Sequence, residues 1–164
     1  MRGSKDDVIY GVSAPIARPE PVGRVAARRH LVQVVDRARV YNADPGRLLT
    51  IAEIKVFGSY LDPAPGYPGD LDLAVSAVQR DSDRDLYVRK VLAYARASGR
   101  RFGAFHELLY WPARELQMVL KNRSPAIRIT DEDISKFTDR FEIIYAVSED
   151  PDAIPPPPNA TARR

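Results

Sequence analysis

Hydrophobic residues recur along the chain with two spacings, one typical of helices and one typical of strands. In residues 22–41, Val25, Val32 and Val35 share one face of a helix, and arginines occupy much of the rest. In residues 51–57, β-branched and charged side chains alternate. That alternation predicts a strand with one buried face.

The remaining segments extend this pattern. Further strands are predicted over residues 71–78, 126–130 and 141–147, and a further helix over residues 83–97. Residues 105–111 fit either a strand or a helix, and Pro112 suits the first turn of a helix that runs to Lys121. Asp131 suits the cap of a short helical turn. The fold class expected is α/β (α+β), with a small mixed sheet of four to five strands and packed helices.

The chain of 164 residues has the length of one domain with additional segments. Residues 1–21 contain three prolines and no periodicity, so we expect a flexible arm. Residues 22–147 should form the domain. Residues 148–164 include four consecutive prolines, which predicts a proline-rich disordered tail.

Composition narrows the possible chemistry. The chain has no cysteine, which excludes disulfides, thiolate zinc sites and a cysteine nucleophile, and its two histidines are far apart. Any metal should therefore be held by carboxylates, which suits Mg²⁺ or Mn²⁺. The formal net charge of +3 permits a phosphate-rich partner without requiring one. No apolar run approaches the ~20 residues of a membrane span, and no signal peptide is apparent, so we expect a cytoplasmic protein without a membrane partner.

The most informative stretch is Gly58-Ser59, followed after ten residues by Asp70-Leu71-Asp72. Glycine has no Cβ, so a phosphate can approach the turn closely, and the Ser59 hydroxyl can donate to phosphate oxygens. Asp70 and Asp72 are two apart on a strand, so their side chains point to the same face. Two carboxylates beside such a turn predict a site for a divalent ion that bridges a nucleoside triphosphate.

At these residues the chain resembles the DNA polymerase beta-like nucleotidyltransferase superfamily, which includes the minimal nucleotidyltransferases of toxin–antitoxin pairs. The resemblance implies that Asp70 and Asp72 hold Mg²⁺ or Mn²⁺ and that Gly58 and Ser59 grip the β- and γ-phosphates. It also implies transfer of a nucleotidyl group from a nucleoside triphosphate to a hydroxyl of a protein, an RNA or a small molecule. Asp131 is the candidate third catalytic carboxylate.

Two departures from the family pattern leave alternatives open. The arginine that often follows Gly-Ser is absent, and the strand expected at residues 126–130 carries no acid, with Asp131 just past its end. The chain could therefore be a catalytically weakened member that acts as a binding or regulatory protein, for example in a toxin–antitoxin pair. A third hypothesis is a nucleic-acid-binding protein that uses the arginine-rich helix Arg24–Arg39. Gly58-Ser59 could also be an ordinary turn, and the aspartates a solvated strand face. Oligomeric state and nucleobase preference cannot be read from the sequence.

Overall fold

The computed structural model describes residues 23–62 and 69–158 and has an α+β fold, in which three helices pack on a four-stranded mixed sheet. The helices are α1 (Arg24–Ala43), α2 (Arg84–Ala97) and α3 (Phe105–Lys121). The strands are β1 (Leu49–Phe57), β2 (Leu71–Gln79), β3 (Ile127–Thr130) and β4 (Phe141–Ala146). Three short 3-10 helices accompany them: η1 (Gly58–Leu61), η2 (Ile134–Lys136) and η3 (Val147–Glu149). The fold class predicted from the sequence is confirmed.

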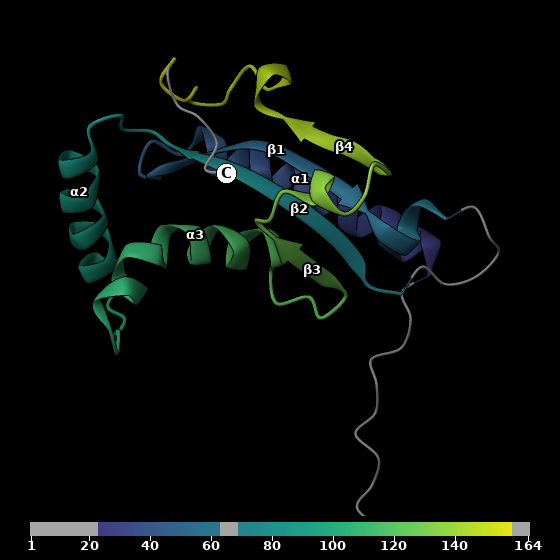
Figure 1. The fold of residues 1–164 in the computed structure, drawn as a ribbon, viewed down its shortest axis with the longest axis horizontal. Helices are drawn as coiled ribbons and strands as arrows, with labels where there is room; N and C mark the ends of the chain where they lie inside the picture. Colours follow the sequence, from purple (N-terminus) through teal and green to yellow (C-terminus); the bar gives the residue numbers. More distant parts are fainter. Residues whose placement is uncertain (1–22, 63–68, 159–164) are drawn as a thin grey trace, which may run out of the picture.

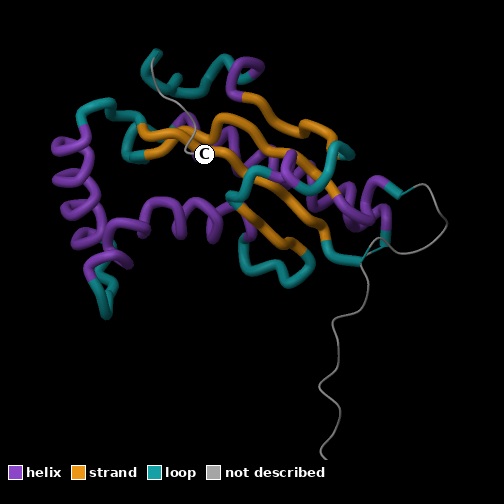
Figure 2. The backbone as a smooth tube through the Cα atoms, viewed as in Figure 1, coloured by secondary structure: helices purple, strands orange, loops and turns teal. Residues whose placement is uncertain are grey.

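The strand order in the sheet is β3-β2-β1-β4. β1 is antiparallel to β2 and to β4, whereas β3 is parallel to β2. In Figure 1, α1 crosses behind the sheet, and η2 lies in front of it. α3 packs on α1, α2 and β3, so α2 is attached to the domain largely through α3. Figure 2 shows which parts of the backbone are helix, strand and loop.

The core lies between the sheet and its helices. Its most buried members come from the three helices and from β1, β2 and β3: Val34, Ala38, Tyr41, Ile51, Ile54, Val56, Leu71, Leu73, Val91, Leu120 and Ile127. On α1 the buried stripe runs through Ala27, Leu31 and Val34, while Val25 is 77% exposed and Val32 is 56% exposed. The face predicted from valine spacing was therefore wrong for Val25 and Val32, whereas Val35 is partly buried against the core. The helix carries two apolar stripes, and the one that holds Leu31 and Tyr41 faces the sheet.

The ends of the helices differ in two places from the prediction. α3 is continuous from Phe105, with Pro112 inside it and not in its first turn. Proline lacks an N–H and therefore costs a helix hydrogen bond, but Trp111, Pro112 and Leu116 are all buried on the side that packs against the domain. The cap of the turn after β3 is Asp133, which accepts a hydrogen bond from the Ser135 amide, and not Asp131.

A buried polar network fastens α1 to β1 and β4. Asn42 exchanges two hydrogen bonds with the Ile51 backbone, at 2.8 and 2.9 Å, and donates to the Tyr145 hydroxyl at 2.6 Å. The Tyr145 hydroxyl donates to Asp150 at 2.7 Å. Burial raises the pKa of Tyr145, and the bond to Asp150 adds to the increase.

The segment after β4 remains in contact with the domain. The Ile154 amide donates to the Asn42 carbonyl at 3.0 Å, and the Ile154 carbonyl accepts from Thr50 at 3.0 Å. The part of the expected tail up to Ile154 therefore lies against α1 and β1. The expected arm at residues 1–21 and residues 159–164 of the expected tail lie outside the described residues. None of the described helices is long and apolar enough to cross a membrane.

Candidate metal and nucleotide site

The Gly-Ser turn and the two aspartates lie at the same end of the sheet. β1 ends at Phe57, and η1 begins at Gly58. In the antiparallel pair, Phe57 lies opposite Asp72, near the start of β2. Because directly opposed residues in such a pair project from the same face, Asp72 points to the side of the sheet on which Phe57 lies. The structure thus brings the two halves of the sequence motif together.

Gly58 is in direct contact with the Asp72 carboxylate. A Cβ placed on Gly58 would lie 2.9 Å from Asp72 Oδ2, and the residue has a φ of +75°, which favours glycine. On the other side of the turn, a Cβ placed on Gly69 would lie 3.9 Å from Ser59 Oγ, and Asp70 follows Gly69. Gly58, Ser59, Asp70 and Asp72 therefore lie close together at this end of the sheet.

An arginine of the neighbouring strand balances the two acids. Arg128 on β3 is the register partner of Asp72, and its Nε lies 2.6 Å from Asp70 Oδ2. Burial raises the pKa of Asp72, the Arg128 charge lowers it, and the Asp70 charge raises it again. The two aspartates therefore lie close enough for the Asp70 charge to act on Asp72. The Arg128 side chain is 72% exposed, so solvent screens its ion pair with Asp70.

Asp131 is not brought to the two aspartates. Thr130 is paired with Ala74, which places Asp131 beyond the paired part of β3, further along β2 than Asp72. Among residues 23–62 and 69–158, no group of three or more His, Cys, Asp or Glu residues could hold a metal ion. The expectation that Asp131 completes a three-carboxylate site has no support in the geometry. The strand position beside Asp72 is taken by Arg128, a cation.

Two further arginines contact the turn from distant parts of the chain. Arg24, at the start of α1, donates to the carbonyls of Tyr60, at 3.4 Å, and Asp62. Arg140, just before β4, donates to the carbonyl of Leu61. Neither contact was predicted from the sequence, in which an arginine was expected only within a few residues of Gly58. No local spacing in the sequence signals these contacts.

The residues present suit one divalent cation of the hard class. Asp70 and Asp72 offer carboxylate oxygens, which are the preferred donors for Mg²⁺ and Mn²⁺. The Asp72 carboxylate can lie against the turn because Gly58 carries no side chain. Two carboxylates leave most coordination positions for water or phosphate, as is usual where Mg²⁺ is bound together with a nucleotide.

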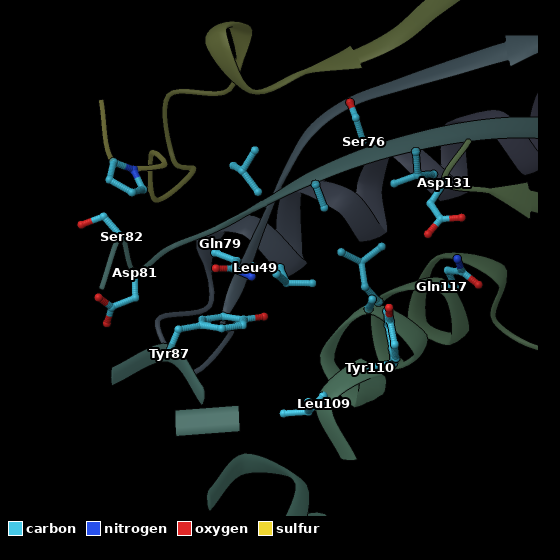
Figure 3. A pocket seen from close by; sticks show the side chains of 16 residues that line it. Leu49, Ser76, Gln79, Asp81, Ser82, Tyr87, Leu109, Tyr110, Gln117 and Asp131 are labelled. Carbon is cyan, nitrogen blue, oxygen red and sulfur yellow. The ribbon is translucent and has the colours of Figure 1, made fainter. Parts of the chain in front are cut away.

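Asp131 instead lines a separate pocket of about 350 Å³ between the second half of β2 and the helices α2 and α3. Figure 3 shows Ser76, Tyr87, Gln117 and Asp131 around this space. Its other acid, Asp81, is paired with Lys90 at 2.6 Å. Among the residues that the structure describes, no lysine or arginine lines the pocket, so it is a poor site for a triphosphate.

Comparisons with known proteins add no assignment: no protein-family model, curated protein or solved structure matches the chain. The case for a function therefore depends on the motif and on its geometry.

Proposed function

We propose that the protein is a metal-dependent nucleotidyltransferase that moves a nucleotidyl group from a nucleoside triphosphate to a hydroxyl acceptor. The observation that carries this proposal is the convergence of Asp70 and Asp72 on the Gly58-Ser59 turn, with Asp72 Oδ2 directly in front of Gly58. Neither residue pair is informative alone. The turn ends β1 and the aspartates begin β2, and the two strands bring them together. Neither an ordinary turn nor a solvated strand face would require this meeting.

Each group has a role that follows from its chemistry. Gly58 and Ser59 would bind the β- and γ-phosphates through the backbone and the hydroxyl, and Asp70 and Asp72 would hold Mg²⁺ or Mn²⁺. When bound, such an ion neutralises triphosphate charge and orients the reacting groups. Arg140, whose guanidinium already reaches η1, adds positive charge beside the turn. The acceptor oxygen bonds to the α-phosphorus, pyrophosphate leaves, and the hydroxyl proton passes to solvent.

Arg128 favours a second candidate, a weakened member of the same family that binds a nucleotide without efficient transfer and acts as a regulatory protein, for example in a toxin–antitoxin pair. It stands at the strand position next to Asp72, pairs with Asp70 at 2.6 Å, and competes with a metal ion for that carboxylate. A site with two carboxylates and a competing cation should hold metal weakly.

Calorimetric titration with ATP, GTP, CTP and UTP, each with and without Mg²⁺, tests for the site. Incubation with labelled triphosphates and cell extract tests for transfer. The Asp70→Asn/Asp72→Asn double variant should lose both Mg²⁺-dependent binding and label transfer. Asp131→Asn is the matched control, and it should keep both because Asp131 lines the separate pocket.

Three results separate the candidates. Transfer by the wild type that the double variant lacks supports the enzyme. Mg²⁺-dependent binding without transfer to any acceptor supports the weakened member. Wild-type protein that binds none of the four triphosphates refutes both.

A further inference from the structure

One row of residues crosses the sheet at the candidate site. Register places Arg128 of β3, Asp72 of β2, Phe57 of β1 and Phe141 of β4 side by side. Residues opposed in this way project from one face. The row therefore changes from charged on β3 and β2 to aromatic on β1 and β4.

The aromatic end of the row is open to solvent. Phe137, in the segment between η2 and β4, is 59% exposed, and Phe141 is 36% exposed. The Phe57 and Phe137 rings meet edge to face, with centroids 6.3 Å apart and an interplanar angle of 62°. Lys55 Nζ lies 4.6 Å from the centre of the Phe141 ring, so a cation borders the same surface. We call Phe57, Phe137 and Phe141 the aromatic surface.

The aromatic surface is attached to the phosphate turn. Phe57 immediately precedes Gly58, and Arg140, the neighbour of Phe141, donates to the Leu61 carbonyl in η1. Neighbouring strands lie about 4.8 Å apart, so Phe57 and Phe141 are roughly one and two strand spacings from Asp72. The ribose of a nucleotide bridges a gap of this size between its base and its phosphates.

We propose that the aromatic surface binds the nucleobase of the triphosphate whose phosphates occupy the Gly58–Asp72 site. This inference rests on the proposed function. Aromatic rings that are exposed together on one face are suited to stack on a nucleobase, and these rings begin where the residues proposed to hold the metal and phosphates end. Stacking on aromatic faces accepts every base, so the four triphosphates should bind with similar affinity, the larger purines somewhat more tightly.

Phe137→Ala tests the proposal, with binding measured by calorimetry for Mg²⁺·ATP, Mg²⁺·UTP and Mg²⁺·tripolyphosphate, which has no base. The variant should bind ATP about five- to 150-fold more weakly, the range that loss of one stacked base implies. Tripolyphosphate affinity should stay within twofold of the wild type. Phe137→Trp should restore ATP binding. Phe105→Ala is the matched control, because Phe105 is equally exposed at 60% but lies on α3.

The outcomes are distinguishable. If the wild type binds neither ATP nor tripolyphosphate with Mg²⁺, the proposed function itself fails, and the base site fails with it. If both ligands bind and Phe137→Ala and Phe141→Ala leave ATP affinity unchanged, only the base site is refuted. If these variants instead convert a dimer to a monomer in sedimentation and leave ATP affinity unchanged, the aromatic surface joins two copies, and the base proposal is overturned. Circular dichroism confirms that each variant is folded.

Discussion

Replacing Gly58 with alanine should separate the requirements of the turn from those of the rest of the fold. The residue has a φ of +75°, and its new Cβ would lie 2.9 Å from Asp72 Oδ2. Two effects follow: backbone strain, which any L-residue suffers at positive φ, and displacement of the Asp72 carboxylate from the turn. The first lowers stability, and the second lowers affinity for metal and nucleotide.

Gly99 provides a control with the first effect alone. Its φ is +68°, and nothing lies within 4 Å of a Cβ placed there. A non-glycine residue in the left-handed region costs about 1–2 kcal/mol. A domain of this size loses about 3–6 °C in melting temperature per kcal/mol. Both Gly58→Ala and Gly99→Ala should therefore melt about 3–12 °C below the wild type.

Only Gly58→Ala should change binding. Moving a group that holds a metal typically costs about 10- to 100-fold in metal affinity, so its Kd for Mg²⁺·ATP should rise at least tenfold in calorimetry. Gly99→Ala should bind as the wild type does. If Gly58→Ala binds Mg²⁺·ATP with wild-type affinity despite its lower melting temperature, Asp72 does not take part in a site at this turn, and the reasoning is refuted.

Two further predictions concern Arg128 and Tyr145. Arg128→Ala removes the cation bound to Asp70. Mn²⁺ affinity, measured by electron paramagnetic resonance, should therefore increase about two- to fivefold, which is the contribution of an exposed ion pair. Unchanged or weaker Mn²⁺ binding would show that Arg128 does not compete with metal. Tyr145→Phe removes the bond to Asp150 and the bond from Asn42, and should cost about 1–3 kcal/mol in urea unfolding at pH 7. Because burial raises the folded-state pKa of Tyr145 above the ordinary 10.0, its contribution is full below pH 10 and declines as the pH rises further, when only the unfolded chain ionises. The difference between wild type and variant should therefore shrink above pH 10, and a constant difference would contradict this account.

The elements of the fold were predictable where the signal was local. Alternation of side chains marked the strands that became β1 and β2, and Asp83 caps α2 as a residue just before a helix should. The buried face of α1 was not predictable from spacing, because the helix has two apolar stripes and only packing selects between them. The continuity of α3 through Pro112 was not predictable either, because it depends on the burial of Trp111 and Leu116, which offsets the lost hydrogen bond.

At the candidate site too, features set by local sequence were predictable and features set by tertiary packing were not. The positions of Gly58 in a turn and of Asp72 in a strand were predictable, because both depend on residues that are adjacent in the sequence. Arg128 was not recognised as a neighbour of Asp72, because the register of a parallel strand depends on a crossover that the sequence does not specify. Asp131 follows β3 as expected, but that register carries it past the aspartates.

The contacts that hold η1 form at different stages of the synthesis of the chain. Arg24 and Arg140, which hold the turn by its carbonyls, come from the first helix and from the segment before the last strand. A nascent chain can complete this turn only after Arg140 has left the ribosome and β4 has joined β1. Partial translation products that lack Arg140 should therefore lack this contact, so any nucleotide binding at the turn that depends on it should appear only late in synthesis.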